Sequence, residues 1–116
     1  SVLISEKAEI GEGTIVCAGT IITVDIKIGN HVILNLDCTV GHDDILENFV
    51  TVYPSVNISG NVRVGECSEL GTGTQIIQGK SITDHTIIGA GAVVVNDIVE
   101  SGTYVGVPVR RVNDDE

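Results

Sequence analysis

The chain has 116 residues, which is enough for one domain and too few for two independent cores. Its formal net charge of −10 argues against nucleic acid as a partner, because phosphate binding needs clustered lysine and arginine. No apolar run approaches the roughly 20 residues that span a bilayer, and no signal peptide is visible, so no membrane span is expected. The three cysteines, Cys17, Cys38 and Cys67, have no metal-type spacing, and we expect reduced thiols in a cytoplasmic protein.

From Ile4 to Val94, every sixth residue is isoleucine, valine or leucine, sixteen times without interruption. A helix repeats its apolar face about every 3.6 residues and a lone strand every 2, so neither produces this pattern. The period predicts a parallel β-solenoid, in which each hexad supplies a strand of about four residues and a two-residue corner. A β-sandwich, the alternative, would show varied loop lengths and turn clusters about every 8–12 residues.

Two further positions of the hexad are regular. The fifth position is small or β-branched in fourteen hexads, which suits a narrow interior, and Asp44 and Lys80 are the two exceptions. A buried charge is costly unless it is paired, so we expect a local bulge, a contact between these two through water, or a nearby subunit boundary. The second position is glycine in six hexads, where we expect a corner with unusual backbone angles: Gly11, Gly29, Gly41, Gly65, Gly71 and Gly89.

The hexads, among them residues 10–15 (IGEGTI) and 88–93 (IGAGAV), resemble those of the hexapeptide-repeat acyltransferases over essentially the whole chain. The resemblance implies an all-β fold, a left-handed parallel β-helix with three hexads in each coil and about five coils. The hand comes from the resemblance alone, since right-handed crossovers are the default for parallel strands. We expect a left-handed β-helix acyltransferase domain over residues 1–99 and a short non-repeating C-terminal tail over 100–116, where residues 106–112 (GVPVRRV) resemble the family's usual ending.

With three hexads in each coil, residues eighteen apart stack at about the 4.8 Å strand spacing. His42 then occupies an outward-pointing third position, Asp43 follows it, and Gly60 lies one coil further on. An imidazole beside a glycine at a coil edge is one way to line a substrate pocket. The alternative is an ordinary surface histidine in a corner.

Residues 40–60 (VGHDDILENFVTVYPSVNISG) resemble the catalytic segment of sugar acetyltransferases related to the sialic-acid O-acetyltransferases. That group includes the N-acetyltransferases of bacterial 4-amino sugars such as bacillosamine and perosamine. The resemblance implies that His42 is the general base, that Asp43 is its acidic neighbour and that Gly60 contacts acetyl-CoA. Thr51 stands where the group often has a second histidine near the thioester carbonyl; its hydroxyl can still donate a hydrogen bond, or the change alters substrate preference or abolishes activity.

The same resemblance assigns the cofactor contacts. Thr72 and Ala90 match positions beside the pantetheine arm of acetyl-CoA, although small residues are also what solenoid corners require. Arg110 and Arg111 are candidates for the CoA phosphates, or a solvated pair that balances the acidic residues 114–116.

No metal site is expected. His31 and His85 share one face but lie three coils apart, about 14 Å, so they cannot ligate one ion together. This disfavours a γ-class carbonic anhydrase, which needs three converging histidines around zinc. We expect both to be surface residues.

Together these features predict an acetyl-CoA-dependent acetyltransferase that acts directly, without an acyl-enzyme, on the amino group of a nucleotide-linked amino sugar. The alternatives are a sugar hydroxyl as acceptor, or a non-catalytic β-solenoid that serves as a scaffold or binding module. The resemblance also implies a homotrimer with active sites between neighbouring prisms, which would cover the apolar outward residues Val24, Leu36, Phe49 and Tyr53. Close relatives carry an N-terminal nucleotide-sugar-binding domain that has no counterpart in this sequence, so the acceptor stays open.

Overall fold

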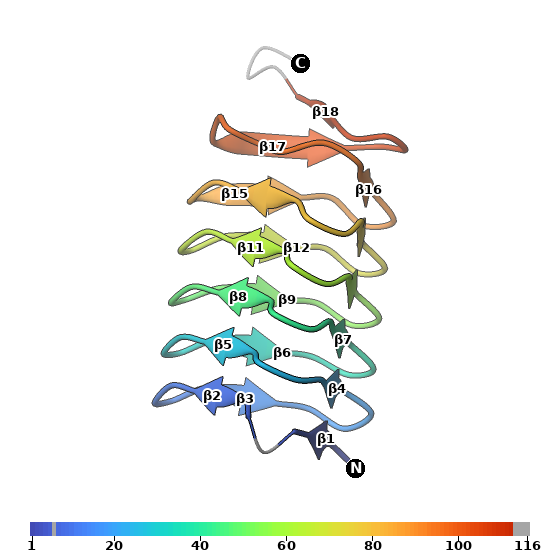
Figure 1. Ribbon diagram of the computed structural model, residues 1–116. Coiled ribbons are helices and arrows are strands. Elements are labelled where there is room, and N and C mark those ends of the chain that lie inside the picture. Colours follow the sequence, from blue (N-terminus) through green and yellow to red (C-terminus); the bar gives the residue numbers. More distant parts are fainter. Residues whose placement is uncertain (6, 113–116) are drawn as a thin grey trace.

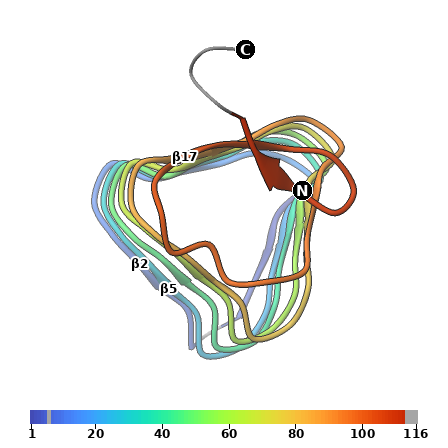
Figure 2. The same ribbon diagram turned by 90° about the horizontal axis from the view of Figure 1, so that it is seen from above.

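The computed structural model describes residues 1–5 and 7–112. These residues form eighteen short strands and no helix, wound into a triangular prism of 44 × 22 × 21 Å (Figures 1 and 2). The six-stranded sheet of the prism, here called the first sheet, corresponds to about six left-handed turns, close to the five predicted. The predicted all-β, left-handed parallel β-helix is therefore confirmed.

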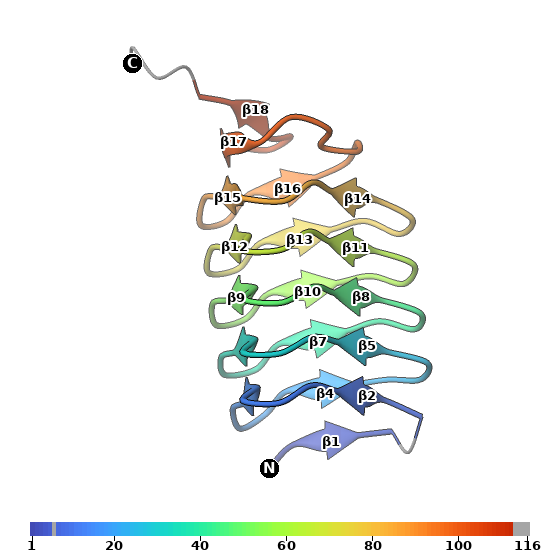
Figure 3. The same cartoon turned by 90° about the vertical axis from the view of Figure 1, so that its left-hand side faces the viewer.

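Each wall of the prism is one sheet, and Figure 3 shows the successive coils from another side. The first sheet contains, in order, β1 (Leu3–Ile4), β4 (Ile21–Ile22), β7 (Thr39–Val40), β10 (Asn57–Ile58), β13 (Gln75–Ile76) and β16 (Val93–Val94). The second sheet contains β2 (Glu9–Ile10), β5 (Lys27–Ile28), β8 (Ile45–Leu46), β11 (Arg63–Val64) and β14 (Ser81–Ile82). The third sheet contains β3 (Ile15–Val16), β6 (Ile33–Leu34), β9 (Thr51–Val52), β12 (Glu69–Leu70), β15 (Thr86–Ile88), β17 (Gly102–Val105) and β18 (Arg110–Arg111).

The register of these walls is the predicted one. From β1 to β16 every neighbouring pair is parallel and joins residues eighteen apart, as in Ile4↔Ile22 and Val52↔Leu70. Most strands have two residues rather than the predicted four, because the corners take up the remaining positions of the hexad. The aliphatic first position points inward throughout, and from Ile22 to Val94 these residues are fully or almost fully buried.

The corners differ from the sequence-based interpretation. Left-handed backbone occurs at the fourth position of the hexad, with φ between 55° and 63° at nine residues that are not glycine, among them Asp43 (61°) and Asn61 (55°). None of the six second-position glycines is left-handed. Glycine is needed there because the next coil passes very close: a Cβ on Gly41 would lie 2.7 Å from the backbone nitrogen of Gly60.

The two ends of the prism are unlike each other. At the C-terminal end β17 pairs with β15 in a sixteen-residue register, β18 folds back antiparallel on β17, and Tyr104 and Val109 pack against the core. Both strands lie within the predicted tail, 100–116, of which residues 113–116 fall outside the described part of the chain. At the N-terminal end the inward-facing Ile4 and Ile10 are 47% and 37% exposed.

Candidate active site

His42 and Asp43 form the corner between β7 and β8. The His42 Nδ1 lies 3.0 Å from the Asp43 Oδ2, and both side chains are about half exposed. An ionised carboxylate only accepts hydrogen bonds, so Nδ1 donates the proton and the lone pair of Nε2 is left free. The left-handed backbone of Asp43 places its side chain beside the ring of its own neighbour.

Gly60 provides the space in which the imidazole lies. A Cβ on Gly60 would lie 2.6 Å from the His42 Cε1 and 2.8 Å from Cδ2, and it would also collide with Nε2. The stacking of His42 against Gly60, expected from the eighteen-residue coil, is therefore present. The corner is tied together by the Asn61 N–H, which donates to the His42 carbonyl at 2.8 Å.

The Gly60 N–H has no partner among the described residues at this corner, and Gly60 itself is buried, with the His42 ring lying against it. Within residues 1–5 and 7–112 this N–H makes no hydrogen bond, although the Gly60 carbonyl accepts one from the Gly79 N–H at 3.0 Å. A free backbone N–H next to a free imidazole nitrogen is the arrangement that acyl transfer needs, since one group takes a proton while the other stabilises an oxyanion.

Asp44 is the polar residue whose state the sequence left open. It is fully buried, and its Oδ1 accepts a hydrogen bond from the Val62 N–H at 2.8 Å. Its Oδ2 has no partner in the described part of the chain, and burial raises the pKa of the carboxyl to about 7.

One of the expected explanations for Asp44, a local bulge of the wall, is contradicted by the strand register. Val62 occupies the same inward position between Asp44 and Lys80, and no ion pair between those two occurs among the described residues. The wall does not bulge, because β7 and β8 keep the eighteen-residue register with both neighbours.

The predicted cofactor residues lie elsewhere on the prism. Thr72 and Ala90 stack at the corner between the third and first sheets, where the Gly91 N–H donates to the Thr72 carbonyl at 2.7 Å. The N–H and the carbonyl of Ala90 have no partner among the described residues, so both can bind a ligand amide. Thr51 is half-buried on β9 in the third sheet. Within one chain, His42, Asp43 and Gly60 are brought together, and Thr51, Thr72 and Ala90 are not brought to them.

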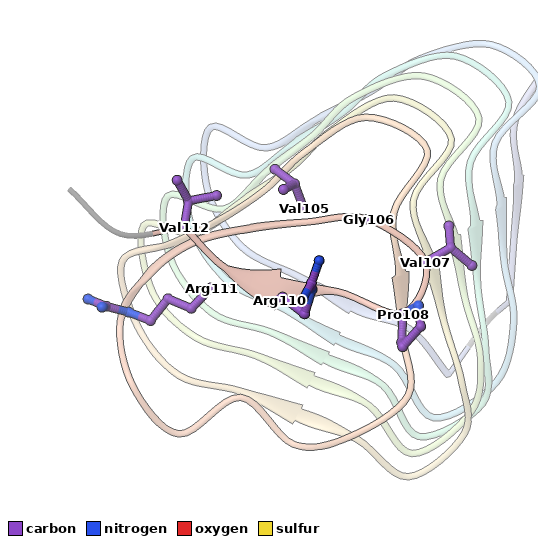
Figure 4. A pocket seen from close by; sticks show the side chains of 7 residues that line it. All are labelled: Val105, Gly106, Val107, Pro108, Arg110, Arg111 and Val112. Carbon is purple, nitrogen blue, oxygen red and sulfur yellow. The ribbon is translucent and has the colours of Figure 1, made fainter. Parts of the chain in front are cut away.

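The tail forms a cavity of about 620 Å³ at the C-terminal end of the prism (Figure 4). Figure 4 shows the side chains of Arg110 and Arg111 pointing in different directions. Arg111 is occupied within the chain, because its guanidinium donates to the Ser101 carbonyl at 3.0 and 3.1 Å and lies 3.9 Å from Glu100. Residues 114–116, the other expected partners of this pair, lie outside the described residues.

The remaining histidines are surface residues, as expected. His31 is exposed and stacks on Phe49 with ring centroids 5.3 Å apart, and His85 is exposed at another coil. Among residues 1–5 and 7–112, no group of three or more side chains is arranged to hold a metal ion, and no helix is long and apolar enough to cross a membrane.

These observations define a class: a left-handed β-solenoid of hexapeptide repeats with a histidine–carboxylate pair set against a glycine at one corner. Solved structures of similar sequence share this fold. The acetyltransferase domain of PglB from Neisseria gonorrhoeae FA1090, in complex with acetyl coenzyme A, is 36% identical with a TM-score of 0.94, over 96% of this chain and 54% of that one. A mutant of perosamine N-acetyltransferase from Caulobacter crescentus, in complex with CoA and GDP-perosamine, is 38% identical with a TM-score of 0.96, over 98% of this chain and 54% of that one.

A curated relative is named serine acetyltransferase, from Haemophilus influenzae; it is 29% identical over an alignment of 100 residues that covers 78% of this chain and 38% of that protein. No protein-family model matches the chain. The chain spans about half the length of the solved structures named above and a smaller share of the curated relative. Its structural neighbours are hexapeptide-repeat sugar acetyltransferases, as the sequence resemblance predicted.

Proposed function

We propose that the chain is the catalytic part of an acetyl-CoA-dependent acetyltransferase that acetylates the amino group of a nucleotide-linked amino sugar. The observation that carries the proposal is the His42–Asp43 pair lying against Gly60, with Nε2 free and a free N–H beside it. The similar structures named for PglB and perosamine N-acetyltransferase support the choice of acetyl-CoA and of an amino sugar.

The reaction is direct transfer. The amine nitrogen attacks the thioester carbonyl, and the Nε2 of His42 takes the proton that the nitrogen loses as the N–C bond forms. The Gly60 N–H donates to the oxyanion of the tetrahedral intermediate. When the C–S bond breaks, CoA leaves as a thiolate and receives the proton from His42. The carboxylate of Asp43 stabilises the imidazolium in between.

A covalent acyl-enzyme is disfavoured by the surroundings of His42. Within the described residues, the polar side chain that contacts its ring is Asp43, and no serine, threonine or cysteine side chain is hydrogen-bonded to it. A nucleophilic hydroxyl or thiol would have to lie within hydrogen-bond reach of the base. Transfer to the acceptor in one step fits these contacts better.

Acetyl-CoA is expected to lie along the corner of Thr72 and Ala90. The unpaired N–H and carbonyl of Ala90 match the amide groups of the pantetheine arm, which can exchange backbone-type hydrogen bonds with them at this corner. Arg110, which unlike Arg111 has no ion pair in the described part of the chain, is the better candidate for the CoA phosphates. Thr51 would contribute its hydroxyl from the third sheet.

This assignment implies a homotrimer. The His42 corner and the Thr72–Ala90 corner flank the first sheet on opposite sides, so acetyl-CoA bound at one corner reaches a His42 most directly in a neighbouring chain. Two of the outward apolar residues expected at a subunit contact fit this pairing, since Val24 lies at the His42 corner and Leu36 at the Thr72–Ala90 corner, and they are 40% and 49% exposed. Sedimentation equilibrium at micromolar concentration should give three times the chain mass; a stable monomer would contradict this arrangement.

The proposal also places the protein in the cytoplasm, where acetyl-CoA and nucleotide sugars are available. The three cysteines are all unpaired, and Cys17 and Cys67 are partly accessible, which fits a reducing compartment. Fractionation of cells that express the tagged protein would test this assignment.

The proposal is tested by following CoA release with acetyl-CoA and a panel of nucleotide sugars that offer either an amine or a hydroxyl. The wild type should turn over a nucleotide amino sugar, and His42→Ala should lower kcat about 10²- to 10⁴-fold. His31→Ala is the matched control, because it removes an exposed histidine from another corner and should keep wild-type kcat. Turnover with the hydroxyl series alone would shift the proposal to O-acetylation, and no turnover by the wild type would favour a scaffold or binding module.

A further inference from the structure

Small polar side chains at the fifth position of the hexad share one hydrogen-bonding pattern. The Thr14 hydroxyl donates to the Gly29 carbonyl, fifteen residues later, at 2.8 Å and accepts from the Val32 N–H, eighteen residues later, at 3.1 Å. Thr20 and Ser68, one and nine hexads after Thr14, make the same two bonds. The thiol of Cys38 and the hydroxyl of Thr74 donate to the carbonyl at the same fifteen-residue offset. Each inward group therefore donates to the coil above it.

Asp44 makes one of these two hydrogen bonds. Its Oδ1 accepts from the Val62 N–H, eighteen residues later, as the hydroxyls do. The carbonyl at the fifteen-residue offset is that of Ser59, and this carbonyl accepts no hydrogen bond within residues 1–5 and 7–112. The buried Oδ2 of Asp44 is also without a partner there. A proton on Oδ2 would satisfy both groups at once.

We propose that Asp44 is held as a neutral carboxylic acid that donates from Oδ2 to the Ser59 carbonyl and thereby positions the peptide that carries the Gly60 N–H. Asp44 is then a positioning residue that acts through the Ser59–Gly60 peptide and does not touch substrate. The inference rests on the proposed function, in which the Gly60 N–H stabilises the oxyanion.

The geometry of the peptide bond links the two sides of the wall. In a trans peptide the C=O and N–H point in opposite directions, so a carbonyl held toward the interior turns the N–H outward. The equivalent N–H groups of Glu12, Asn30 and Glu66 point outward, because each donates to a side chain of the next coil outside the wall. The His42 ring lies on this outer surface, against Gly60. A hydrogen bond to the carbonyl also polarises the peptide, which makes the N–H a better donor to a developing negative charge.

The surroundings of Asp44 favour the neutral form. The same inward position is occupied by Ile26 in the coil below and by Val62 in the coil above, and both are buried aliphatic residues. The charged groups that act on the carboxyl are His42 and Asp43 on its own corner, and burial has the larger effect and raises its pKa to about 7. An ionised Asp44 would lose the donor and leave a charge among aliphatic side chains.

Three variants distinguish a role of Asp44 as a neutral hydrogen-bond donor from a role that depends on its negative charge. Asp44→Thr and Asp44→Asn can both accept from Val62 and donate to Ser59, so kcat should stay within about threefold of wild type. Asp44→Val fits the aliphatic interior but cannot donate, and kcat should fall about 10- to 100-fold with little change in KM for acetyl-CoA, as when an oxyanion donor is displaced. If Asp44→Thr and Asp44→Asn lose as much activity as Asp44→Val, Asp44 acts through its charge and the inference is wrong.

The pH dependence adds a second measurement. The ratio of wild-type to Asp44→Thr kcat should fall as the pH is raised from 6 to 9, because Asp44 ionises in this range and threonine does not. His42 and Asp43 face Asp44 and are present in both proteins. A ratio that does not change with pH would contradict a neutral donor.

Infrared spectroscopy tests the proton without any turnover. Wild-type protein at pH 6 should show the C=O stretch of a protonated carboxylic acid, and this band should be missing in Asp44→Asn. If the wild type shows the band but transfers no acetyl group, the proposed function fails while the state of Asp44 stands. If it transfers acetyl groups and lacks the band, this inference fails alone.

Discussion

At the scale of single residues, the partner of His42 should matter through its charge. The Asp43 carboxylate lies 3.0 Å from the His42 Nδ1 and stabilises the imidazolium that forms during transfer. Asp43→Asn keeps an oxygen that accepts from Nδ1 but removes the charge, so kcat should fall about tenfold, on the order of 1.4 kcal/mol in the barrier. Steady-state kinetics check this, with KM for acetyl-CoA as the internal control. A kcat equal to that of wild type would show that Asp43 only orients the ring.

Gly60 should tolerate no side chain. Its missing Cβ is the space that the His42 ring occupies, and the backbone of Gly60 is not left-handed, so Gly60→Ala affects the site rather than the chain conformation. We expect kcat to fall about 100-fold or more, because the ring must turn away from Asp43. Thermal unfolding followed by circular dichroism should change little, since the colliding ring is half exposed and can move.

The neighbouring Ser59→Ala is the matched control for Gly60→Ala. Ser59 is exposed, and its substitution leaves the backbone carbonyl in place. This variant should keep wild-type kcat. Equal losses in Ser59→Ala and Gly60→Ala would mean that the whole corner, rather than the space over Gly60, determines activity.

The sequence located this corner because a strict period converts residue numbers into positions. Eighteen residues separate His42 from Gly60, and the coil length alone stacks them. The sequence could not reveal the protonation state of Asp44. That state depends on the Asp44 Oδ2 and the Ser59 carbonyl, which both have no partner among the described residues, and the repeat pattern contains no information about either.

At the scale of the hexad, the left-handed fourth position is the least obvious feature. Ser55 has φ of 60° on an exposed corner, and a β-branched residue is strained there by about 1–2 kcal/mol. Ser55→Val should therefore lower the free energy of unfolding by about that amount, measured in urea. Ser55→Gly, which accepts this φ, should stay within about 0.5 kcal/mol of wild type, because relief of strain offsets the added chain entropy. Equal stabilities for the two variants would contradict a left-handed corner.

The composition of the fourth position did contain the information. Aspartate, histidine and glycine recur there and asparagine occurs once, and these are the residues that adopt left-handed backbone most readily. The prediction from the sequence instead assigned the unusual backbone angles of the corners to the second-position glycines. Those glycines are needed because the next coil passes close to them, and a sequence pattern does not contain that distance.

At the scale of the whole molecule, the two ends of the prism should differ in stability. Within residues 1–116, the first-coil anchors Ile4 and Ile10 are partly exposed, whereas β17 and β18 cover the other end. A coil with exposed anchors and few buried contacts opens locally at little cost. Amide hydrogen exchange should therefore be fastest over residues 1–16 and slowest over the middle coils, residues 40–70. Uniform protection along the chain would contradict this gradient.

Other large-scale features lay beyond the sequence. The six-residue period does not by itself give the number of residues in a coil. Both the three-hexad coil and the left hand came from the family resemblance. The sixteen-residue register between β15 and β17 lies beyond the end of the aliphatic period, so the repeat could not predict it.

The constant eighteen-residue step has one more consequence, which concerns portability. Because the backbone of each corner is a translated copy of the one before it, backbone geometry alone sets no preferred level for chemistry. The changes Gly60→His, Asn61→Asp, Val62→Asp and Gln78→Gly, combined with His42→Ala, would rebuild the same imidazole, carboxylate, buried acid and empty space about 4.8 Å further along the axis. A reactive centre on this solenoid can therefore be moved along the axis by a whole number of coils, while the groups that bind its co-substrate keep their positions.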